Sequence, residues 1–212
     1  MNKTATIFLN GEFPGKSILS EYLKRSEFII AADGGGNLLI EKKIIPHFII
    51  GDLDSLSEKS REYYKIRKVK IIRIKEQETT DFEKCLNFCL KFAIKEIYVM
   101  GGMSLRPDHT LNNISILKRY HKKLNIKFIS DEFEIFFIDK EIDFAYKLNE
   151  TVSFIAVPSA NGVVTSGLKY KLSGDRLEFG VREGTLNTSV KKNISISFKS
   201  GSLLLFKKHF II

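Results

Sequence analysis

Two aspartates one residue apart, Asp52 and Asp54, end the segment "HFIIGDLD" (residues 47–54), directly after an apolar run. In an extended chain, side chains two positions apart point to the same side, with Cα atoms about 7 Å apart. Carboxylates placed in this way repel each other unless a cation lies between them, and their oxygens are the hard ligands that Mg²⁺ prefers. Because protein-bound Mg²⁺ usually also holds substrate phosphate oxygens, the pair predicts a phosphate ester or anhydride as substrate.

Other aspartates also come just after apolar segments typical of strands. Asp33 ends "EFIIAAD", Asp81 follows "VKIIRI", and Asp108 follows "KEIYVMGG". In an open parallel sheet the carboxyl ends of the strands lie along one edge, where ligand crevices form. We therefore expect these carboxylates to converge with Asp52 and Asp54 into one metal and phosphate site.

The glycines of "ADGGGNLL" (32–39) follow a predicted strand and precede a predicted helix. Glycine lets the backbone N–H groups approach a phosphate or nucleotide closely. The segment matches neither the dinucleotide-binding fingerprint nor the phosphate-binding loop of the Walker A type. A simple tight turn is the alternative explanation for these glycines.

Helix capping is the alternative explanation for several polar residues near these segments. Ser55 with Glu58, and Thr80 with Glu83, fit the S/T-x-x-E capping box. Aspartates in the first turn of a helix are also favourable because of the helix dipole, and His109 fits a hydrogen-bonded residue at a helix start. Capping does not explain why so many aspartates fall at the same predicted edge of the sheet.

The elements that must position these residues alternate along the first part of the chain. Near-continuous apolar runs, as expected for strands covered on both faces, occupy residues 4–11, 27–33, 47–54, 69–74 and 95–102. Amphipathic segments typical of helices occupy residues 15–25, 36–43, 56–66, 81–94 and 108–123. This alternation predicts an α/β fold with a doubly wound, mostly parallel sheet, which we assign to residues 1–132.

The character of the sequence changes after this region. Apolar and polar residues alternate, with turn residues between the runs, in segments 133–139, 151–157, 162–172, 176–181, 193–200 and 202–208. We therefore expect a small all-β sandwich domain over residues 133–212. Such a small domain can be stabilised by docking or dimerisation.

Composition limits the function classes. No run approaches the roughly 20 apolar residues of a membrane span, so we expect a soluble, cytoplasmic protein without a membrane partner. Cys85 and Cys89 share one face of a predicted helix, which favours buried free thiols in a reducing compartment. The net charge of +9 is spread along the chain, so it favours phosphate-bearing ligands over nucleic acid.

Taken in order, the motifs "ADGGGNLL", "GDLDS", "EQETTDFEKC" and "GGMSLRPDHTLNNI" resemble those of the thiamine pyrophosphokinase family, as does "SGLKYKL" near the C-terminal end. The resemblance implies an α/β domain joined to a β-sandwich, and a homodimer. It implies a thiamine diphosphokinase, a transferase of thiamine diphosphate biosynthesis that moves the pyrophosphoryl group of ATP onto the hydroxyl of thiamine and releases AMP. Mg²⁺ would be the cofactor and ATP the co-substrate.

The resemblance also implies roles for individual residues. The catalytic residues would be Asp52, Asp54, Asp81, Arg106 and Asp108, of which Asp52, Asp54 and Asp81 would be the metal ligands. Residues expected to bind ATP are Asp33, Gly34, Gly35, Ser55, Gln77, Thr80, His109 and Asn112. Residues expected to bind thiamine are Thr110, Ser166 and Asn187. Arg106 would stabilise charge on the phosphates, and Asp108 is a candidate to orient or deprotonate the thiamine hydroxyl.

The sequence departs from the family pattern at a few positions. Glu78 stands where many members have Asp, and Pro107 replaces a large apolar residue. The segment "TLNTS" keeps only Asn187 of a Ser-Asn-Glu triplet, and the chain has no tryptophan to stack on a thiamine ring. These departures concern the acceptor half of the site more than the nucleotide half.

Other function classes stay open at this point. An Asp-x-Asp pair after a strand also serves metal-dependent nucleotide-sugar transferases, or other nucleotide-diphosphate transferases. A nucleotide-sensing or nucleic-acid-binding module is suggested only by the net charge of +9. The sequence lacks the clustered basic and aromatic residues that such a module needs.

Overall fold

The computed structural model describes residues 3–103 and 106–211, so Ser104 and Leu105 of the fourth motif lie outside the described residues. The chain divides into two compact units, the first made of Met1–Asp131 with Ile211–Ile212 and the second of Glu132–Phe210. Among the described residues, no helix combines the length and the apolar character that crossing a membrane requires.

The first unit alternates strands and helices, as the sequence predicts. Its elements are β1 (Lys3–Phe8), α1 (Lys16–Lys24), β2 (Phe28–Ala32), α2 (Gly35–Glu41), β3 (Phe48–Gly51), α3 (Glu58–Ile66), β4 (Lys70–Arg73), α4 (Asp81–Lys91), β5 (Ile94–Met100), α5 (Pro107–Tyr120) and β6 (Asn125–Ile129).

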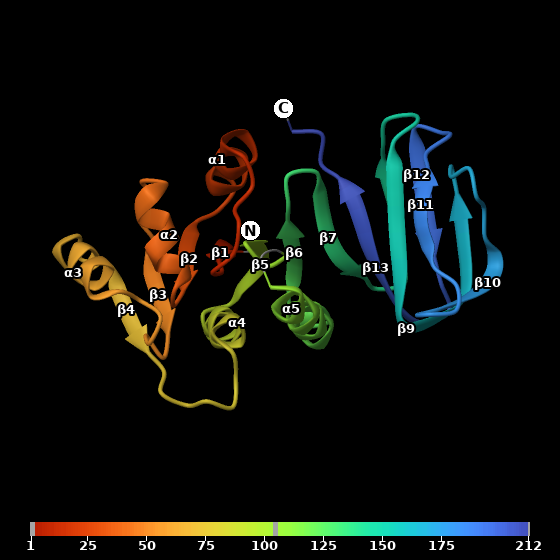
Figure 1. Cartoon of the computed structure of the whole chain (residues 1–212). Helices are drawn as coiled ribbons and strands as arrows, with labels where there is room; N and C mark the ends of the chain where they lie inside the picture. The colour runs from red at the N-terminus through yellow and green to blue at the C-terminus, as the bar shows by residue number, and fades with distance from the viewer. Residues whose placement is uncertain (1–2, 104–105, 212) are drawn as a thin grey trace. The chain divides into compact units, whose positions relative to one another are not determined.

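The strands of this unit lie in the order β4-β3-β2-β1-β5-β6, and every neighbouring pair is parallel. The chain moves outward from β1 to β4 and then crosses back to β5, so the winding direction reverses between β1 and β5. Right-handed crossovers then place α1, α2 and α3 on one face of the sheet and α4 and α5 on the other, as Figure 1 shows. The predicted doubly wound parallel sheet is confirmed.

Apolar side chains hold helices to both faces of this sheet. On one face, Tyr22 of α1, Leu39 of α2 and Tyr64 of α3 are fully buried in a cluster with side chains of β1 and β3. On the other face, α4 packs against β2, β3 and β5. Cys85 and Cys89 of α4 are free and buried there, as predicted, and burial raises the pKa of both thiols.

The second unit consists of antiparallel strands around a separate apolar cluster. Its elements are β7 (Phe133–Ile138), β8 (Glu141–Ala145), β9 (Thr151–Ser166), β10 (Ser173–Glu178), β11 (Gly184–Thr188), β12 (Asn193–Ser197) and β13 (Ser200–Lys208). Within the unit the strand order is β7-β13-β9-β12-β8, and β10 and β11 also pair with β9. The predicted β-rich domain is confirmed.

One prediction for this unit is wrong. Residues 151–157 and 162–172 were expected to form separate strands, but β9 runs without a break from Thr151 to Ser166 and is the longest strand in Figure 1. The pairing of β9 with β13 shifts register between Ala156 and Ala160, so Pro158 lies at an irregularity of the ladder. Proline is tolerated at such a bulge because no ladder hydrogen bond needs its missing N–H group.

Candidate functional site

The structure gathers three carboxylates at the carboxyl ends of β2 and β3 and the start of α4. Oxygens of Asp33, Asp52 and Asp81 all lie within 4.8 Å of one another. Asp33 directly follows β2, Asp52 follows β3, and Asp81 is the first residue of α4. This is the convergence expected for the carboxyl edge of a parallel sheet, and the donors are the hard oxygens that suit Mg²⁺.

Asp54 is not part of this carboxylate cluster. Strand β3 ends at Gly51, and Leu53 adopts a positive φ of 69°, so the Asp-x-Asp segment turns instead of running on as a strand. The backbone N–H of Asp54 donates to Asp52 Oδ1 at 3.2 Å, and its Oδ1 accepts a hydrogen bond from the Ser55 hydroxyl at 3.0 Å. The expected extended conformation is therefore wrong, although the Asp54 side chain still interacts with those of Asp33 and Asp52.

Asp33 fastens the loop that follows β3. Its side chain accepts backbone hydrogen bonds from Ser55 and Leu56, each at 3.0 Å, and the residue is only 2% exposed. Burial raises the pKa of Asp33 to about 6, and the nearby charges of Asp81 and Asp54 add to the shift. A cation beside these carboxylates would relieve that repulsion, so the residues present fit a metal ion.

Glycines allow the close approach of these segments. A Cβ atom on Gly51 would lie 2.7 Å from Asp33 Cβ and 3.0 Å from Asp81 Oδ1, so a side chain there would push the two aspartates apart. A Cβ atom on Gly35 would lie 2.5 Å from the carbonyl oxygen of Phe8. The glycines of "ADGGGNLL" thus let the start of α2 pack directly against the end of β1.

Two polar side chains hold the carboxylate and the backbone of Asp52 in position. Gln77 Nε2 donates to Asp52 Oδ2 at 2.9 Å, and Arg73 Nε donates to the Asp52 carbonyl oxygen at 3.0 Å. The hydrogen bond from Gln77 lowers the pKa of Asp52, which keeps this carboxylate ionised. Gln77 was expected near phosphates, and it lies against a carboxylate of the cluster.

A buried lysine, which sequence reasoning missed, supports Asp81. Lys84 Nζ lies 3.1 Å from Asp81 Oδ1, and the Lys84 side chain is only 3% exposed. Burial is the largest single effect and opposes the charged form, but the hydrogen bond to Asp81 and the nearby carboxylate charges together outweigh it and raise the pKa of Lys84. The available signal was the i,i+3 spacing of the two residues on a helix.

One of the two predicted capping boxes is present. Thr80 caps α4, and its partner Glu83 returns the reciprocal bond to the Thr80 backbone. The box predicted for Ser55 and Glu58 is wrong, because Ser57 caps α3 and accepts from the Ser60 N–H group. Ser55 instead bonds to Asp33 and Asp54, which leaves it in the candidate site.

A cleft of about 390 Å³ opens beside the cluster, where the winding direction reverses between β1 and β5. Ligands of doubly wound folds bind at such a switch point. Of the predicted site residues, those that line the cleft are Asp33, Gly34, Ser55, Thr80, Asp81, Arg106, His109 and Asn112. Asn10 and Asn113 also line it and were missed, because isolated asparagines give no distinctive sequence signal.

Arg106 and Asp108 pair with each other at the start of α5. Arg106 Nη2 lies 2.6 Å from Asp108 Oδ2, and both side chains are more than half exposed. This hydrogen bond lowers the pKa of Asp108 to about 2. Thr110, one turn further on, donates its hydroxyl to the Arg106 carbonyl oxygen at 3.2 Å. Asp108 is therefore set apart from the aspartate cluster.

The second unit carries the two remaining predicted residues. Asn187 is buried, and its side chain accepts from the Tyr170 N–H at 3.0 Å and donates to the Tyr170 carbonyl oxygen at 2.7 Å. Ser166 is exposed at the end of β9. Asn187 thus holds the backbone of the "SGLKYKL" motif in place.

The protein thus consists of an α/β unit and an all-β unit. The cleft at the switch point of the α/β unit is lined by carboxylates, an arginine and hydrogen-bond donors. This set of side chains is typical of a site for metal-assisted phosphate transfer. Two family models match the chain: thiamin pyrophosphokinase, catalytic domain, over residues 19–129, and thiamin pyrophosphokinase, vitamin B1 binding domain, over residues 137–203. The chain belongs to the thiamin pyrophosphokinase family.

Individual relatives agree with the family models. The chain is 27% identical to thiamin pyrophosphokinase 1 of Caenorhabditis elegans, covering 94% of this chain and 86% of the relative. It is 26% identical to the thiamine pyrophosphokinase of Bacillus subtilis, over 89% and 91% of the two chains. None of these names supports the nucleotide-sugar transferase alternative.

Solved structures support the fold. The crystal structure of Bacillus subtilis thiamine pyrophosphokinase matches with a TM-score of 0.84 at 24% identity, covering 97% of this chain and 99% of that one. Yeast thiamin pyrophosphokinase matches with a TM-score of 0.85 at 21% identity, over 98% and 86%. At these identities the likeness establishes the shared architecture of both units.

Proposed function

We propose that the protein is a thiamine diphosphokinase, which transfers the pyrophosphoryl group of ATP to the hydroxyl of thiamine and yields thiamine diphosphate and AMP. The observation that carries this proposal is the convergence of Asp33, Asp52 and Asp81 at the switch point of a chain that matches both domains of the family. A cluster of this kind suits a cation that holds a polyphosphate.

Mg²⁺ is the metal that these residues suit, with Asp52, Asp54 and Asp81 as ligands and Asp33 beside them. Asp52 and Asp81 already lie within one small cluster, and the exposed Asp54 side chain interacts with Asp52 and Asp33 beside it. When bound, the ion would neutralise phosphate charge and polarise the phosphoryl group under attack. Lys84 and Gln77 keep the Asp81 and Asp52 carboxylates in position.

The residues of the cleft bind the donor. Arg106 at the N-cap of α5 and His109 and Asn112 within it line the same cleft as two of the aspartates, Asp33 and Asp81, so the phosphates of ATP would lie among these side chains. The remaining residues proposed to contact ATP are Gly34, Gly35, Ser55, Gln77 and Thr80. Arg106 offers a planar pair of N–H donors to phosphate oxygens.

In the transfer step, the thiamine hydroxyl oxygen forms a bond to the β-phosphorus and gives up its proton to solvent, the bond from that phosphorus to the α,β-bridging oxygen breaks, and AMP leaves with that oxygen. Arg106 stabilises the charge that develops on the phosphates. Asp108 accepts a hydrogen bond from the hydroxyl and orients it. A loose transition state depends on positioning and charge stabilisation more than on a strong base.

The residues that we propose to bind the acceptor are Thr110, Ser166 and Asn187. Support comes from the vitamin B1 binding family model, whose match at residues 137–203 contains both second-unit residues. Asn187 acts through the backbone of Tyr170, whose side chain is 61% exposed and offers an aromatic face in a chain without tryptophan.

The assembly that we propose is a homodimer in the cytoplasm. Large apolar side chains of the second unit are exposed, including Phe179, Val181 and Leu186 at 63%, 76% and 77%. A second copy of the chain would remove this apolar surface from water. The buried free thiols of Cys85 and Cys89 are typical of a reducing compartment.

A direct assay tests this function. Purified protein with ATP, Mg²⁺ and thiamine is expected to form thiamine diphosphate and AMP in equal amounts, which chromatography can quantify. EDTA is expected to abolish the reaction. Formation of ADP with thiamine monophosphate would refute pyrophosphoryl transfer, and failure of thiamine to accept at all would refute the acceptor.

A further inference from the structure

The turn between Asp52 and Asp54 is centred on a leucine in a strained backbone conformation. Leu53 has a φ of 69°, in the left-handed region that bulky residues seldom adopt. Such a conformation persists only where the surrounding structure enforces it, and it is found most often at functional sites. The Leu53 side chain supplies one constraint, because it is only 7% exposed and packs in the apolar cluster of the first unit. Its backbone carbonyl group needs a second one.

Arg61 of α3 holds this carbonyl group. Its Nη2 donates to the Leu53 carbonyl oxygen at 3.0 Å. Its Nε is buried and has no hydrogen-bond partner among the described residues, and Glu58 Oε2 lies 3.8 Å from it. A buried donor without an acceptor costs stability, so the placement of this guanidinium favours a role other than stabilising the fold.

Helix α3 is a fixed support for the contact. Near its start, the Ser57 hydroxyl accepts a hydrogen bond from the Ser60 N–H at 3.2 Å. One turn after Arg61, the fully buried Tyr64 donates its hydroxyl to the Gly36 carbonyl oxygen at 2.7 Å, which joins α3 to α2. A side chain carried by an anchored helix restricts its partner more tightly than one carried by a loop.

The conformation of Leu53 decides how the neighbouring carboxylates are oriented. With Leu53 left-handed, the Asp54 N–H reaches Asp52 Oδ1 at 3.2 Å. A hydrogen bond from the backbone to an aspartate two residues earlier needs a turn, so it would be lost if Leu53 relaxed to an extended conformation. Arg73 holds the Asp52 carbonyl oxygen at 3.0 Å, which fixes only the start of the turn. The middle of the turn depends on Arg61.

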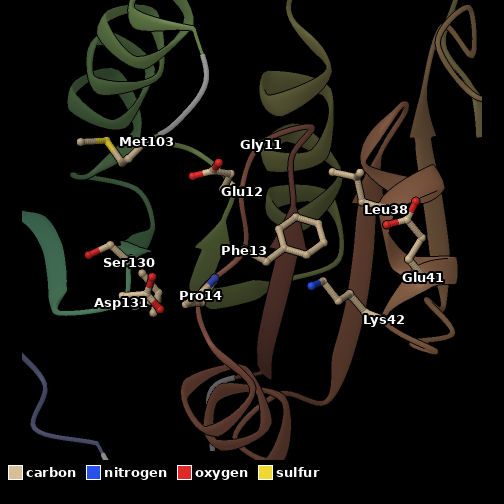
Figure 2. A pocket seen from close by; sticks show the side chains of 12 residues that line it. Gly11, Glu12, Phe13, Pro14, Leu38, Glu41, Lys42, Met103, Ser130 and Asp131 are labelled. Atoms are coloured by element: carbon tan, nitrogen blue, oxygen red, sulfur yellow. The ribbon is translucent and has the colours of Figure 1, made fainter.

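Arg61 reaches the site through the backbone and not through a cavity. It is not among the described residues that line the aspartate cleft. It also does not line the other cavity drawn in Figure 2, of about 470 Å³, whose described lining comes from the loop after β1, from α2, and from the chain after β5 and β6. We therefore expect any effect of Arg61 on ligand binding to pass through the Leu53 carbonyl group.

We propose that Arg61 is a positioning residue of the metal site. By holding the Leu53 carbonyl group it keeps the turn left-handed, and the turn orients Asp52 and Asp54 for binding a divalent cation. The inference rests on the proposed function in one respect, namely that these two aspartates bind Mg²⁺. Arg61 touches neither the ion nor the substrates.

Calorimetry with Mg²⁺ alone tests this role through the sign of the change. Arg61→Met keeps the aliphatic part of the side chain and removes the donor. It is expected to weaken Mg²⁺ binding about tenfold, because groups that orient metal ligands affect metal affinity by this order. If Arg61 acted only through its charge, it would repel the cation, and Arg61→Met would strengthen binding.

Two further variants complete the series. Arg61→Lys keeps the charge and a donor on a chain one bond shorter, so it is expected to weaken Mg²⁺ binding only about threefold. Arg67→Met is the matched control. Arg67 ends the same helix and donates to the Tyr63 carbonyl oxygen at 3.2 Å, so its loss removes a comparable bond outside the Asp-x-Asp turn. It is expected to leave Mg²⁺ affinity within about twofold.

The backbone of the metal-free protein gives a second readout. The NMR carbon chemical shifts of Leu53 report its φ, and we expect them to move away from left-handed values in Arg61→Met and to stay unchanged in Arg67→Met. Unchanged or stronger Mg²⁺ binding by a folded Arg61→Met variant would overturn the proposal. So would left-handed Leu53 shifts that persist in that variant, or an equal loss of affinity in Arg67→Met. If Arg61→Met does not fold, Arg61→Lys decides, and wild-type Mg²⁺ affinity in that variant would overturn the proposal.

These outcomes are distinct from failure of the proposed function. A protein whose Mg²⁺ affinity and Leu53 shifts respond as expected, but which makes no thiamine diphosphate, refutes the activity and leaves the role of Arg61 intact. A protein that makes thiamine diphosphate, and whose Arg61→Met variant binds Mg²⁺ as the wild type does, refutes this role and leaves the activity intact.

Discussion

The Asp33 carboxylate makes the stability of the metal-free protein depend on pH. Its pKa is about 6 in the folded chain against an ordinary value of 3.8, because burial disfavours the charged form. A raised pKa contributes stability that is fully present below pH 3.8 and is lost as the pH rises through 6. With 1.36 kcal/mol for each pKa unit, the whole loss is about 3 kcal/mol, of which about 2 kcal/mol falls between pH 4 and pH 7.

The variant Asp33→Asn isolates this effect. The amide keeps one acceptor oxygen for the N–H groups of Ser55 and Leu56, so losing the second bond costs about 1–2 kcal/mol at every pH. We therefore expect the free energy of unfolding of the wild type, minus that of the variant, to fall by about 2 kcal/mol from pH 4 to pH 7 in EDTA. This difference is measured by urea unfolding, with hydrogen exchange of amides in the first unit as the probe.

Added Mg²⁺ should remove most of this pH dependence in the wild type, because a bound cation stabilises the charged carboxylates. In the Asp33→Asn variant, added Mg²⁺ should change the pH dependence of the unfolding free energy less than it does in the wild type. The contradicting result is a wild-type minus variant difference in the free energy of unfolding that stays constant or rises with pH. Burial of Asp33 would then not destabilise its charged form.

Other substitutions test the remaining roles. Asp54→Ala should lower kcat about a hundredfold or more, measured by AMP release, while leaving the unfolding free energy nearly unchanged, since it removes one of several like charges. Lys84→Met should lower Mg²⁺ affinity 10–100-fold by calorimetry, because the Asp81 carboxylate loses its fixed partner, and Lys84→Arg should restore part of it. Asn187→Ala should raise the KM for thiamine roughly tenfold and that for ATP less, because losing a hydrogen bond that holds Tyr170 costs about 1 kcal/mol.

Each of these predictions has a contradicting result. Full activity of Asp54→Ala would remove that residue from the metal site. Unchanged Mg²⁺ affinity of a folded Lys84→Met variant would make the lysine a purely structural residue. A larger rise in the KM for ATP than for thiamine would place Asn187 outside the acceptor pocket.

The sequence was sufficient to predict the elements of the first unit because strands covered on both faces and amphipathic helices give different periodicities. It also placed Asp33, Asp52 and Asp81 at one edge, because parallel strands share their carboxyl end. It failed in the second unit at β9, where Pro158 and Gly162 look like the end of a strand. In the structure a bulge accommodates the proline, and such a bulge depends on the partner strand.

Within the site, the errors have a common cause. The positive φ of Leu53 makes the Asp-x-Asp segment turn, and a residue with a side chain gives no local signal of that conformation. The burial of Lys84, and the bonds from Ser55 to Asp33, depend on packing between segments far apart in sequence. Residue type and spacing predicted that Asp33, Asp52 and Asp81 meet, but not that Lys84 and Gln77 hold two of them in place.

The exposed pair of Arg106 and Asp108 links the arrival of a phosphate to the basicity of a carboxylate. An anion that draws the guanidinium away leaves Asp108 without the cation that holds its pKa near 2, so that pKa rises toward the ordinary value. The same exchange of partners would make the carboxylate a better proton acceptor only after the donor has bound. An arginine shared in this way favours an order of events in which the nucleotide enters before the alcohol can react.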